Sequence, residues 1–354
     1  MRSWRSSTVF TEPTTSLVSS ARRRTTWLFG ILLVLTFGSV VVGVAVGPVV
    51  VPLRRILASL FGYEAGLSAI QEVIVWQLRL PRTLLGLLVG GGLAVSGAAM
   101  QGLFRNPLAS PYVLGVASGA STGAALAILL AGGMAVLLPV GAFAGAALAV
   151  LVVYSLARPG GRRTSIFTLI LAGVAVGSFF SAITSFLIFL SSGGEKLSDV
   201  LFWIMGGLGR ADWAGLAILA PVILICIGAI FYFARDLNAL ALGEETAQHV
   251  GVNPETLYKG LLVLTTTLTA ASVALAGTIG FIGLAIPHIM RLLLGPDHRR
   301  LIPASALAGG CFLVWSDLVA RTAFAPAELP VGVITAFFGA PFFLYLLRSK
   351  GAKL

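Results

Sequence analysis

The chain has 354 residues, of which 57% are hydrophobic and only 10% are charged, and it carries a formal net charge of +11. A soluble domain averages about 25% charged residues, so this composition excludes a water-soluble protein and indicates a membrane protein with many spans. The positive charge does not indicate a nucleic-acid partner, because the basic residues lie at the ends of apolar runs, as the positive-inside rule describes.

Residues 1–26 are rich in Ser, Thr and Arg and are expected to form a cytoplasmic tail. The apolar run that follows, 27–46, is longer than the core of a signal peptide, which has about 7–15 residues. No small-x-small cleavage site follows it. We therefore expect an uncleaved first transmembrane helix.

The remaining apolar runs predict an all-α membrane protein with one transmembrane domain at 27–348 and a cytoplasmic tail at 349–354. A helix needs about 20 apolar residues to cross a hydrocarbon core of about 30 Å. Because it is short and contains Pro287, the eighth of ten runs is expected to be broken or tilted. The ten spans are expected near 27–47, 82–103, 112–131, 135–157, 166–190, 213–234, 258–277, 281–294, 301–320 and 331–348.

Ten spans place both termini on one side of the membrane. With the termini inside, most of the 24 basic residues lie in cytoplasmic segments, which favours cytoplasmic termini. The run 200–208 is too short to span and is expected to form a helix near the surface. The segments 93–102 and 273–283 resemble each other in spans of opposite direction, an arrangement common in transporters.

Motifs for bond chemistry are absent from the sequence. It has no G-x-x-x-x-G-K-[ST] phosphate loop and no H-E-x-x-H zinc motif, and its three histidines are scattered. We therefore expect neither an enzyme nor a bound metal or cofactor. Cys226 and Cys311 lie inside apolar runs, so no disulfide is expected.

A polar stretch, LALGEETAQHVGV at 240–252, interrupts the apolar pattern between the sixth and seventh spans. As a helix it would place its carboxylates, glutamine and histidine on one side, and Leu242, Ala247 and Val250 on the other. A solvated loop helix and a docking helix for a cytoplasmic partner both fit this pattern. The residues concerned are Gly243, Glu244, Glu245, Gln248, His249 and Gly251, the last of which can end the helix in the left-handed conformation.

Six stretches resemble, in order, the permease subunits of the iron-chelate (siderophore), haem and vitamin B12 class of ABC importers. The resemblance covers most of the chain, from about 77 to 347. The stretches are QLRLPRTLLGLLVGGGLAVSGAAMQGLFRNPLASPYVLGVASGA at 77–120, LILAGVAVGSFFSA at 169–182, FWIMGGLGRADW at 202–213, LALGEETAQHVGV at 240–252, GTIGFIGLAIPHIMRLLLGPDHRRLIPASALAGG at 277–310 and SDLVARTAFAPAELPVGVITAFFGAPFFLYLL at 316–347.

The resemblance implies a ten-span homodimer in the plasma (inner) membrane of a prokaryote. Two separate ATPase subunits would bind ATP and Mg, and a periplasmic or lipid-anchored binding protein would deliver the substrate. The stretch 240–252 would be the coupling helix that inserts into the ATPase. We expect transport of a ferric siderophore or haem, with cobalamin as the alternative.

The same resemblance assigns further roles, each with a structural alternative. Arg79, Arg82 and Arg321 would dock the binding protein, although arginines at span ends also anchor helices at the lipid interface, and Asp317 lies four residues before Arg321, where it can pair with it. The cytoplasmic gate would include Asn106 and Leu108, which also fit a plain turn, and Thr164 and Ser165.

Small residues recur at intervals of four in two spans. Gly173, Gly177 and Ser181 form a small-xxx-small face suited to close packing, and the resemblance implies that this span lines the pathway. Gly90, Ala94, Ala98 and Gly102 repeat the pattern and are expected to pack only.

Two alternatives compete with these assignments. An ion-driven secondary transporter usually needs intramembrane carboxylates, and Asp317 is the sole acidic candidate deep in a span. His288 and His298 are expected to be structural rather than haem ligands.

Overall fold

The computed structural model describes residues 15–60, 66–131, 134, 136–157, 166–191 and 194–350. Within these residues all regular structure is helical, as the sequence predicts. The elements are α1 Thr15–Ala45, α2 Leu53–Leu60, α3 Ala69–Val73, the π-helix η1 Ile74–Arg79, α4 Leu80–Leu103, the 3₁₀-helix η2 Pro111–Leu114, α5 Val116–Ala131, α6 Leu137–Leu156, α7 Ile166–Leu190, α8 Glu195–Met205, α9 Trp213–Tyr232, α10 Ala234–Ala241, α11 Glu244–His249, α12 Pro254–Ala276, α13 Ile282–Leu294, α14 His298–Thr322 and α15 Val331–Lys350.

Seven segments of the described chain are long and apolar enough to cross a membrane, and all seven overlap predicted spans. The other three predicted spans coincide with shorter apolar helices at 116–130, 282–294 and 331–345, so ten crossings stay a prediction. The short α8 occupies the place of the expected surface helix. The seven long segments are Arg23–Ala45, Ala69–Leu103, Leu137–Leu156, Phe167–Leu190, Trp213–Tyr232, Pro254–Ala276 and His298–Thr322.

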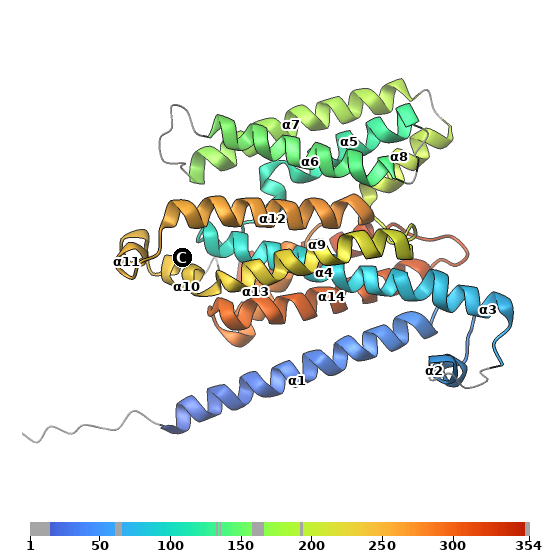
Figure 1. Cartoon of the computed structure of the whole chain (residues 1–354), viewed down its shortest axis with the longest axis horizontal. Helices are drawn as coiled ribbons and strands as arrows, with labels where there is room; N and C mark the ends of the chain where they lie inside the picture. Colours follow the sequence, from blue (N-terminus) through green and yellow to red (C-terminus); the bar gives the residue numbers. More distant parts are fainter. Residues whose placement is uncertain are drawn as a thin grey trace, which may run out of the picture.

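Helix α4 lies in the middle of the bundle, between α12 and α14, and nearly all its residues are buried (Figure 1). Close approach of α4 and α14 depends on small residues, because a Cβ on Gly90 would clash with the carbonyl of Gly309. A Cβ on Gly102 would clash likewise with the ring of His298. The packing role predicted for this small-residue face is therefore confirmed.

Helices α5, α6 and α7 form a second group on one side of α12 (Figure 1). Gly123 of α5 faces Gly141 of α6 so closely that a Cβ on Gly123 would clash with the Gly141 carbonyl. In lipid, where water drives no hydrophobic association between helices, such close backbone contact supplies the van der Waals attraction.

The two segments that resemble each other, 93–102 and 273–283, lie against one another. A Cβ on Gly97 would clash with the carbonyl of Gly283, and Gln101 Nε2 donates a hydrogen bond of 3.1 Å to the carbonyl of Leu284. Helix α12 ends at Gly277, which has φ +67°, and α13 starts only at Ile282. The interruption explains why the eighth apolar run forms a helix of 13 residues.

The bundle has two ends (Figure 1). We call the end that carries α10, α11 and the start of α12 the α11 end; the start of α1 and the end of α15 lie there too. The opposite end, with α2, α3 and the start of α4, is the α3 end. First and last described helices that begin and end at the same end of the bundle agree with an even number of crossings.

Candidate functional site

The α11 end is built on α10, which follows α9 after the single residue Phe233. Leu237 and Leu240 of α10 are fully buried, so this helix is anchored in the bundle. Gly243 then reverses the chain with φ +118°, and α11 runs from Glu244 to His249. Gly251 has φ +87°, which confirms the predicted helix and its left-handed glycine terminus.

Of the three apolar residues expected on the side of this helix opposite its polar residues, one is buried. Ala247 is 0% exposed, but Leu242 is 75% and Val250 66% exposed. Leu242 and Val250 do not share a buried side with Ala247, because Leu242 precedes the helix and Val250 follows it. Exposed apolar side chains beside the polar Glu245, Gln248 and His249 form a surface typical of protein docking.

Glu244 ties α11 to its neighbours rather than projecting freely. Its Oε1 accepts a hydrogen bond of 3.0 Å from the hydroxyl of Tyr258, and it lies 3.6 Å from Arg105 Nη2. Arg105 belongs to the turn after α4 and has φ 48°, a backbone conformation that residues other than glycine rarely adopt. Sequence reasoning missed Arg105 and Tyr258, because their proximity to Glu244 follows only from the fold.

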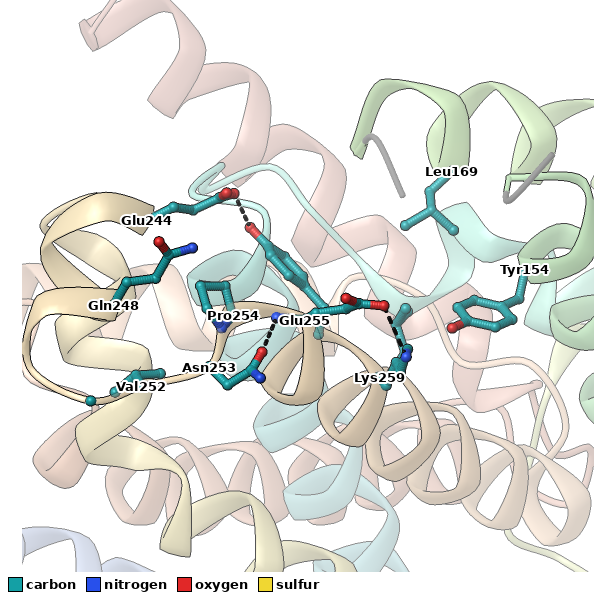
Figure 2. A pocket seen from close by; sticks show the side chains of 12 residues that line it. Tyr154, Leu169, Glu244, Gln248, Val252, Asn253, Pro254, Glu255 and Lys259 are labelled. Carbon is teal, nitrogen blue, oxygen red and sulfur yellow. Dashed lines mark hydrogen bonds and ion pairs between the residues drawn. The ribbon is translucent and has the colours of Figure 1, made fainter. Parts of the chain in front are cut away.

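A cavity of about 500 Å³ opens beside Glu244, between α11, the first turns of α12, and the facing ends of α6 and α7 (Figure 2). Polar groups from Gln248, Asn253, Glu255 and Lys259 line one side of it. Asn253 caps α12 through bonds to the amides of Glu255 and Thr256. The surface around α11 therefore combines exposed side chains with a cavity that a side chain of a partner could enter.

The turn proposed for the gate lies next to this surface. Asn106 Oδ1 accepts a hydrogen bond of 2.9 Å from the Leu108 amide, which stabilises the turn, and Leu108 is 45% exposed. Both residues fit the plain turn, and their gate role stays a prediction. Thr164 and Ser165 lie outside the described residues.

The predicted pathway residues of α7 do not share one open face. Gly173 is buried, and a Cβ there would clash with the carbonyl of Val113. Gly177 lies 3.5 Å, measured from an ideal Cβ, from Ser118 Oγ, whereas Ser181 is exposed. The two glycines therefore pack α7 against η2 and α5, and the pathway role stays a prediction.

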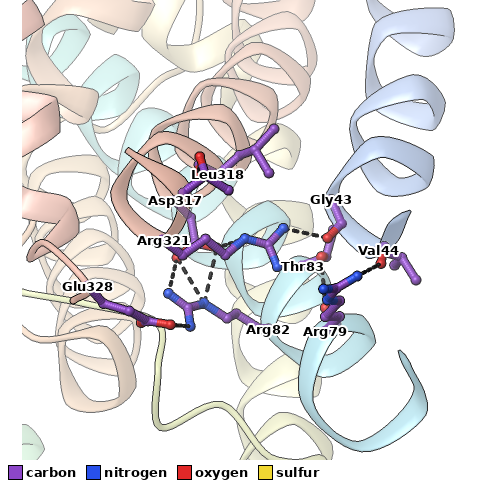
Figure 3. Close-up of polar contacts among 10 residues, drawn as sticks. Gly43, Val44, Arg79, Arg82, Thr83, Asp317, Leu318, Arg321 and Glu328 are labelled. Carbon is purple, nitrogen blue, oxygen red and sulfur yellow. Dashed lines mark hydrogen bonds and ion pairs between the residues drawn. The ribbon is translucent and has the colours of Figure 1, made fainter. Parts of the chain in front are cut away.

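At the α3 end, two of the three predicted docking arginines point inward (Figure 3). Arg79 is 5% exposed and its Nη1 donates to the carbonyls of Val44 at 3.2 Å and Ala45 at 2.9 Å. Arg321 is 3% exposed and its Nη2 donates to the carbonyl of Gly43. These carbonyls belong to the last turn of α1, and carbonyls in the last turn of a helix have no hydrogen-bond donors within that helix.

Arg79 and Arg321 thus complete the end of α1, and in this arrangement neither presents its guanidinium group to an outside protein. The positive charges also suit the negative end of the helix dipole. The Arg79 side chain fills the space beside Gly47, where a Cβ would lie 2.8 Å from its Cζ. These two side chains therefore anchor α1 inside the protein rather than at the lipid interface, and their docking role stays a prediction.

Arg82 is the member of the group that retains access to the surface. Its Nε and Nη2 donate to Asp317 at distances of 2.9–3.1 Å, and its Nη1 lies 3.0 Å from Glu328 Oε2 (Figure 3). Asp317 Oδ2 also lies 3.6 Å from Arg321 Nε, which confirms the predicted pair four residues apart. Glu328, which sequence reasoning missed, completes the network.

Histidine, cysteine and carboxylate side chains of the described residues form no group of three that could hold a metal ion. His298 is 2% exposed, and its Nδ1 lies 2.8 Å from Asn238 Oδ1 of α10. His288 is 8% exposed within α13. Burial and the Asn238 contact give His298 a structural place at the start of α14.

Comparison with known families agrees with this architecture. The model of the FecCD transport family matches residues 31–349. The chain is a member of the FecCD transport family. This FecCD protein is an ABC importer permease and a multi-pass membrane protein, as its motifs predict.

Named relatives of this FecCD permease are vitamin B12 permeases. It is 42% identical, over 93% of its own length and 96% of the relative's, to the vitamin B12 import system permease protein of Klebsiella pneumoniae. It is 43% identical, over 82% and 77% of the two chains, to the cobalamin import system permease protein of Halobacterium salinarum.

Solved structures show the same fold. A structure described as an inward-facing conformation of a metal-chelate type ABC transporter matches with a TM-score of 0.81 and 33% identity, over 92% of this chain and 99% of the other. The PsaBC complex of Streptococcus pneumoniae matches with a TM-score of 0.55 at 20% identity, over 78% and 95%, which supports the fold alone.

Proposed function

We propose that this FecCD permease acts as a homodimer in an ABC importer of cobalamin. Two separate ATPase subunits, which hold ATP and Mg, dock at the α11 end, and a substrate-binding protein docks at the α3 end. The observation that carries the proposal is α11 with its flanking turns, where Leu242, Glu245 and Val250 are exposed beside an anchored helix pair. Such a surface suits a soluble partner, because it is both apolar and charged.

Cobalamin takes precedence over a ferric siderophore or haem because of the relatives. Proteins that match most of this chain at 42–46% identity carry cobalamin or vitamin B12 in their names. A ferric siderophore or haem remains the second candidate, as the family's iron-chelate members suggest. The substrate-binding protein is expected to select among them, because no ligand-specific cluster lines α7.

The burial and ion pairing of Asp317 favour an ABC importer over an ion-driven transporter. Its carboxylate is 5% exposed and is held by both Arg82 and Arg321. A carboxylate that binds and releases a coupling ion must be able to change partners or protonation state. Asp317 is instead fixed between two permanent cations.

The pathway between protomers is proposed to follow the open face of α7. Ser178, Ser181 and Ser185 are exposed and recur at intervals of three and four, so they share one side of the helix. Hydroxyl groups favour a water-accessible route over lipid contact. Ser181 thereby keeps its predicted role, with Ser178 and Ser185 as neighbours.

Reconstitution tests the proposal directly. The purified chain is combined in liposomes with candidate ATPase subunits and candidate substrate-binding proteins, and ATP-dependent uptake of cobalamin, a ferric siderophore and haem is measured. We expect cobalamin uptake that requires all three components, and background ATP hydrolysis by the permease alone. Uptake of an iron chelate but not cobalamin would transfer the proposal to the second candidate, and uptake driven by an ion gradient without ATP would contradict it.

A further inference from the structure

Two cavities near the α11 end join into one space that has a polar and an apolar part. The polar part is the cavity of about 500 Å³ beside α11 (Figure 2). The apolar part is a groove of about 440 Å³ that continues from it along α6 and α12, toward the middle of both helices. At their junction the two parts share four lining residues, Tyr154, Leu169, Lys259 and Leu262. The space is therefore amphipathic along its length.

The walls of the groove are mostly apolar and open toward lipid. Leu151 of α6 and Val263 of α12 line it and are each 65% exposed, although both lie in helices long enough to cross a membrane. Leu114, at the end of η2, is 1% exposed and closes the groove on the inside. The interior of a bilayer holds no water, so side chains exposed at this depth contact hydrocarbon. The occupant that this environment supplies is an acyl chain.

The polar part carries charges of both signs. Lys259 Nζ lies 2.9 Å from Glu255 Oε1, one turn earlier on α12, and the two side chains are 47% and 50% exposed. An ion pair this exposed can exchange its partners at little cost. Glu244 also lines the cavity and is held by Tyr258 and Arg105. The described lining of this cavity thus offers two carboxylates and one ammonium group, which disfavours a purely anionic occupant.

Lys259 and Tyr154 lie where the polar part meets the apolar one. Tyr154 is in the last turn of α6 and Lys259 in the second turn of α12. Tyrosine is enriched at membrane–water interfaces, and a lysine there keeps its aliphatic stem in hydrocarbon and its ammonium group at the lipid head groups. A lipid in this space would have its phosphate at the height of Lys259 and an acyl chain along the groove.

We propose that this space binds one phospholipid whose head group carries both a phosphate and a primary ammonium group, as in phosphatidylethanolamine. The phosphate takes the place of Glu255 at Lys259, and the ammonium group pairs with the carboxylate that the phosphate displaces. One acyl chain lies in the groove. Residues proposed above for the cytoplasmic partner line neither part of the space, so lipid and partner use different residues; they are Leu242, Glu245 and Val250.

Native mass spectrometry of the full chain, released from detergent, tests the proposal. Phosphatidylethanolamine, phosphatidylglycerol and phosphatidylcholine are added one at a time at equal concentration. We expect a retained adduct of phosphatidylethanolamine that is about two- to fivefold more abundant than the other two, the range set by an exposed ion pair. Phosphatidylglycerol lacks the ammonium group, and the trimethylammonium group of phosphatidylcholine donates no hydrogen bond to Glu255.

Variants of the charged pair test the head-group assignment. Glu255→Gln removes the carboxylate that pairs with the ammonium group, so the preference for phosphatidylethanolamine over phosphatidylglycerol should vanish or reverse. Lys259→Gln should lower the adducts of both lipids. Arg235→Gln removes the same charge from an exposed position on α10 that lines neither part, so it is the matched control and should change neither adduct.

A variant that fills the groove tests the acyl-chain assignment. The ring introduced by Ala147→Phe would occupy the space of the chain, and a several-fold loss of the phosphatidylethanolamine adduct is expected, because each methylene group kept out of apolar contact weakens binding. Ala217→Phe, at an exposed position of α9 outside both parts, is the matched control. If Ala147→Phe does not fold, Ala147→Leu, which narrows the same groove, replaces it.

Several outcomes would overturn the proposal. More abundant adducts of phosphatidylglycerol than of phosphatidylethanolamine contradict the head-group assignment, and an equal loss in Ala217→Phe contradicts the groove. Displacement of the lipid by glycerophosphoethanolamine, which has the head group but no acyl chains, contradicts the amphipathic site. Loss of dimer instead of lipid in Ala147→Phe would assign the groove to contact between two copies of the chain. The measurement needs neither substrate nor ATPase, so its failure leaves the proposed function standing.

Discussion

At the scale of single residues, the arginines of this permease show how one residue type serves two purposes. Arg79 and Arg321 lie almost fully inside the protein and satisfy the carbonyls at the end of α1. Arg82 shares their neighbourhood but reaches the surface through Glu328. The difference follows from which acceptor each side chain meets, backbone carbonyls for the first two and carboxylates for the third.

Replacing Arg79 with alanine should destabilise the protein and leave its surface almost unchanged, because the Arg79 side chain is buried. Carbonyls of Val44 and Ala45 would lose their donor, and an unsatisfied buried acceptor costs about 1–3 kcal/mol. Thermal unfolding of the detergent-solubilised chain measures the effect. Arg54→Ala, on the exposed surface of α2, should leave the unfolding temperature unchanged. Normal stability of Arg79→Ala with lost binding-protein docking would restore the docking assignment for Arg79.

At the scale of elements, α10 and α11 act as a unit held from three sides. Asn238 Nδ2 of α10 donates a hydrogen bond of 2.7 Å to Asp297 Oδ1. Asn238 Oδ1 accepts a hydrogen bond of 2.9 Å from the His298 amide at the start of α14. Glu244 of α11 contacts Tyr258 of α12 and the turn after α4. A displacement of α11 is therefore expected to move α12 and the turn after α4 through Glu244, and the start of α14 through Asn238 of α10.

Glu245→Lys should weaken association with the ATPase subunits while membrane insertion stays normal. Glu245 is exposed, so the change removes no internal contact, but it reverses a charge within the proposed interface. Such reversals commonly cost several kcal/mol of binding when the partner charge is complementary. Copurification of the ATPase from membranes measures it. Asp199→Lys makes the same charge change at the α3 end, and equal ATPase loss in both variants would contradict docking through α11.

Asn238→Ala should uncouple the two ends more than it destabilises the bundle. The substitution removes three hydrogen bonds between Asn238 and the start of α14, one to Asp297 and two to His298. We expect the ratio of uptake to ATP hydrolysis in proteoliposomes to fall, with subunit assembly retained. Asn253→Ala, which removes a helix cap at the same end without touching α14, is the control. An equal fall in both variants would assign the effect to general loosening.

At the scale of the whole molecule, the fold depends on backbone contact between helices, both between neighbours in the sequence and between helices far apart in it. Gly90 meets Gly309, Gly97 meets Gly283, and Gly123 meets Gly141. These contacts bring α4 against α14 and α13, and α5 against α6. In a lipid environment this packing takes the place that hydrophobic burial has in water.

Gly97→Ala should therefore lower stability and yield far more than a glycine substitution in open space. The added methyl group would overlap the carbonyl of Gly283, so α4 and α13 would have to separate. Overpacking of this kind typically costs about 1–3 kcal/mol or more. Gly228→Ala in α9 has no atom within 4 Å of the new Cβ and serves as the matched control. Thermal unfolding and monodispersity in detergent measure both, and equal stability of the two variants would contradict the packing role.

Much of this protein could be predicted from its sequence because the signals are local. Apolar length identifies helices such as α9 and α12, and a polar interruption with glycines at both ends identifies α11. The order of the family motifs identifies an importer permease. Each of these signals lies within a few consecutive turns, so no knowledge of long-range contacts is needed.

The tertiary structure decided what depends on contacts between distant segments. Arg79 turns inward because the fold brings the end of α1, more than 30 residues earlier (Val44 is 35 positions away), to its guanidinium group. Glu328 joins Arg82 across 246 positions of the chain. Leu242 and Val250 remain exposed because the glycine turns place them outside α11. The sequence by itself determined the long apolar helices and the family, but not α2, α3 and η1, which precede the expected start of the second span. Which polar side chains hold the helices together and which meet a partner depended on packing, because burial and ion pairing are properties of the assembled bundle.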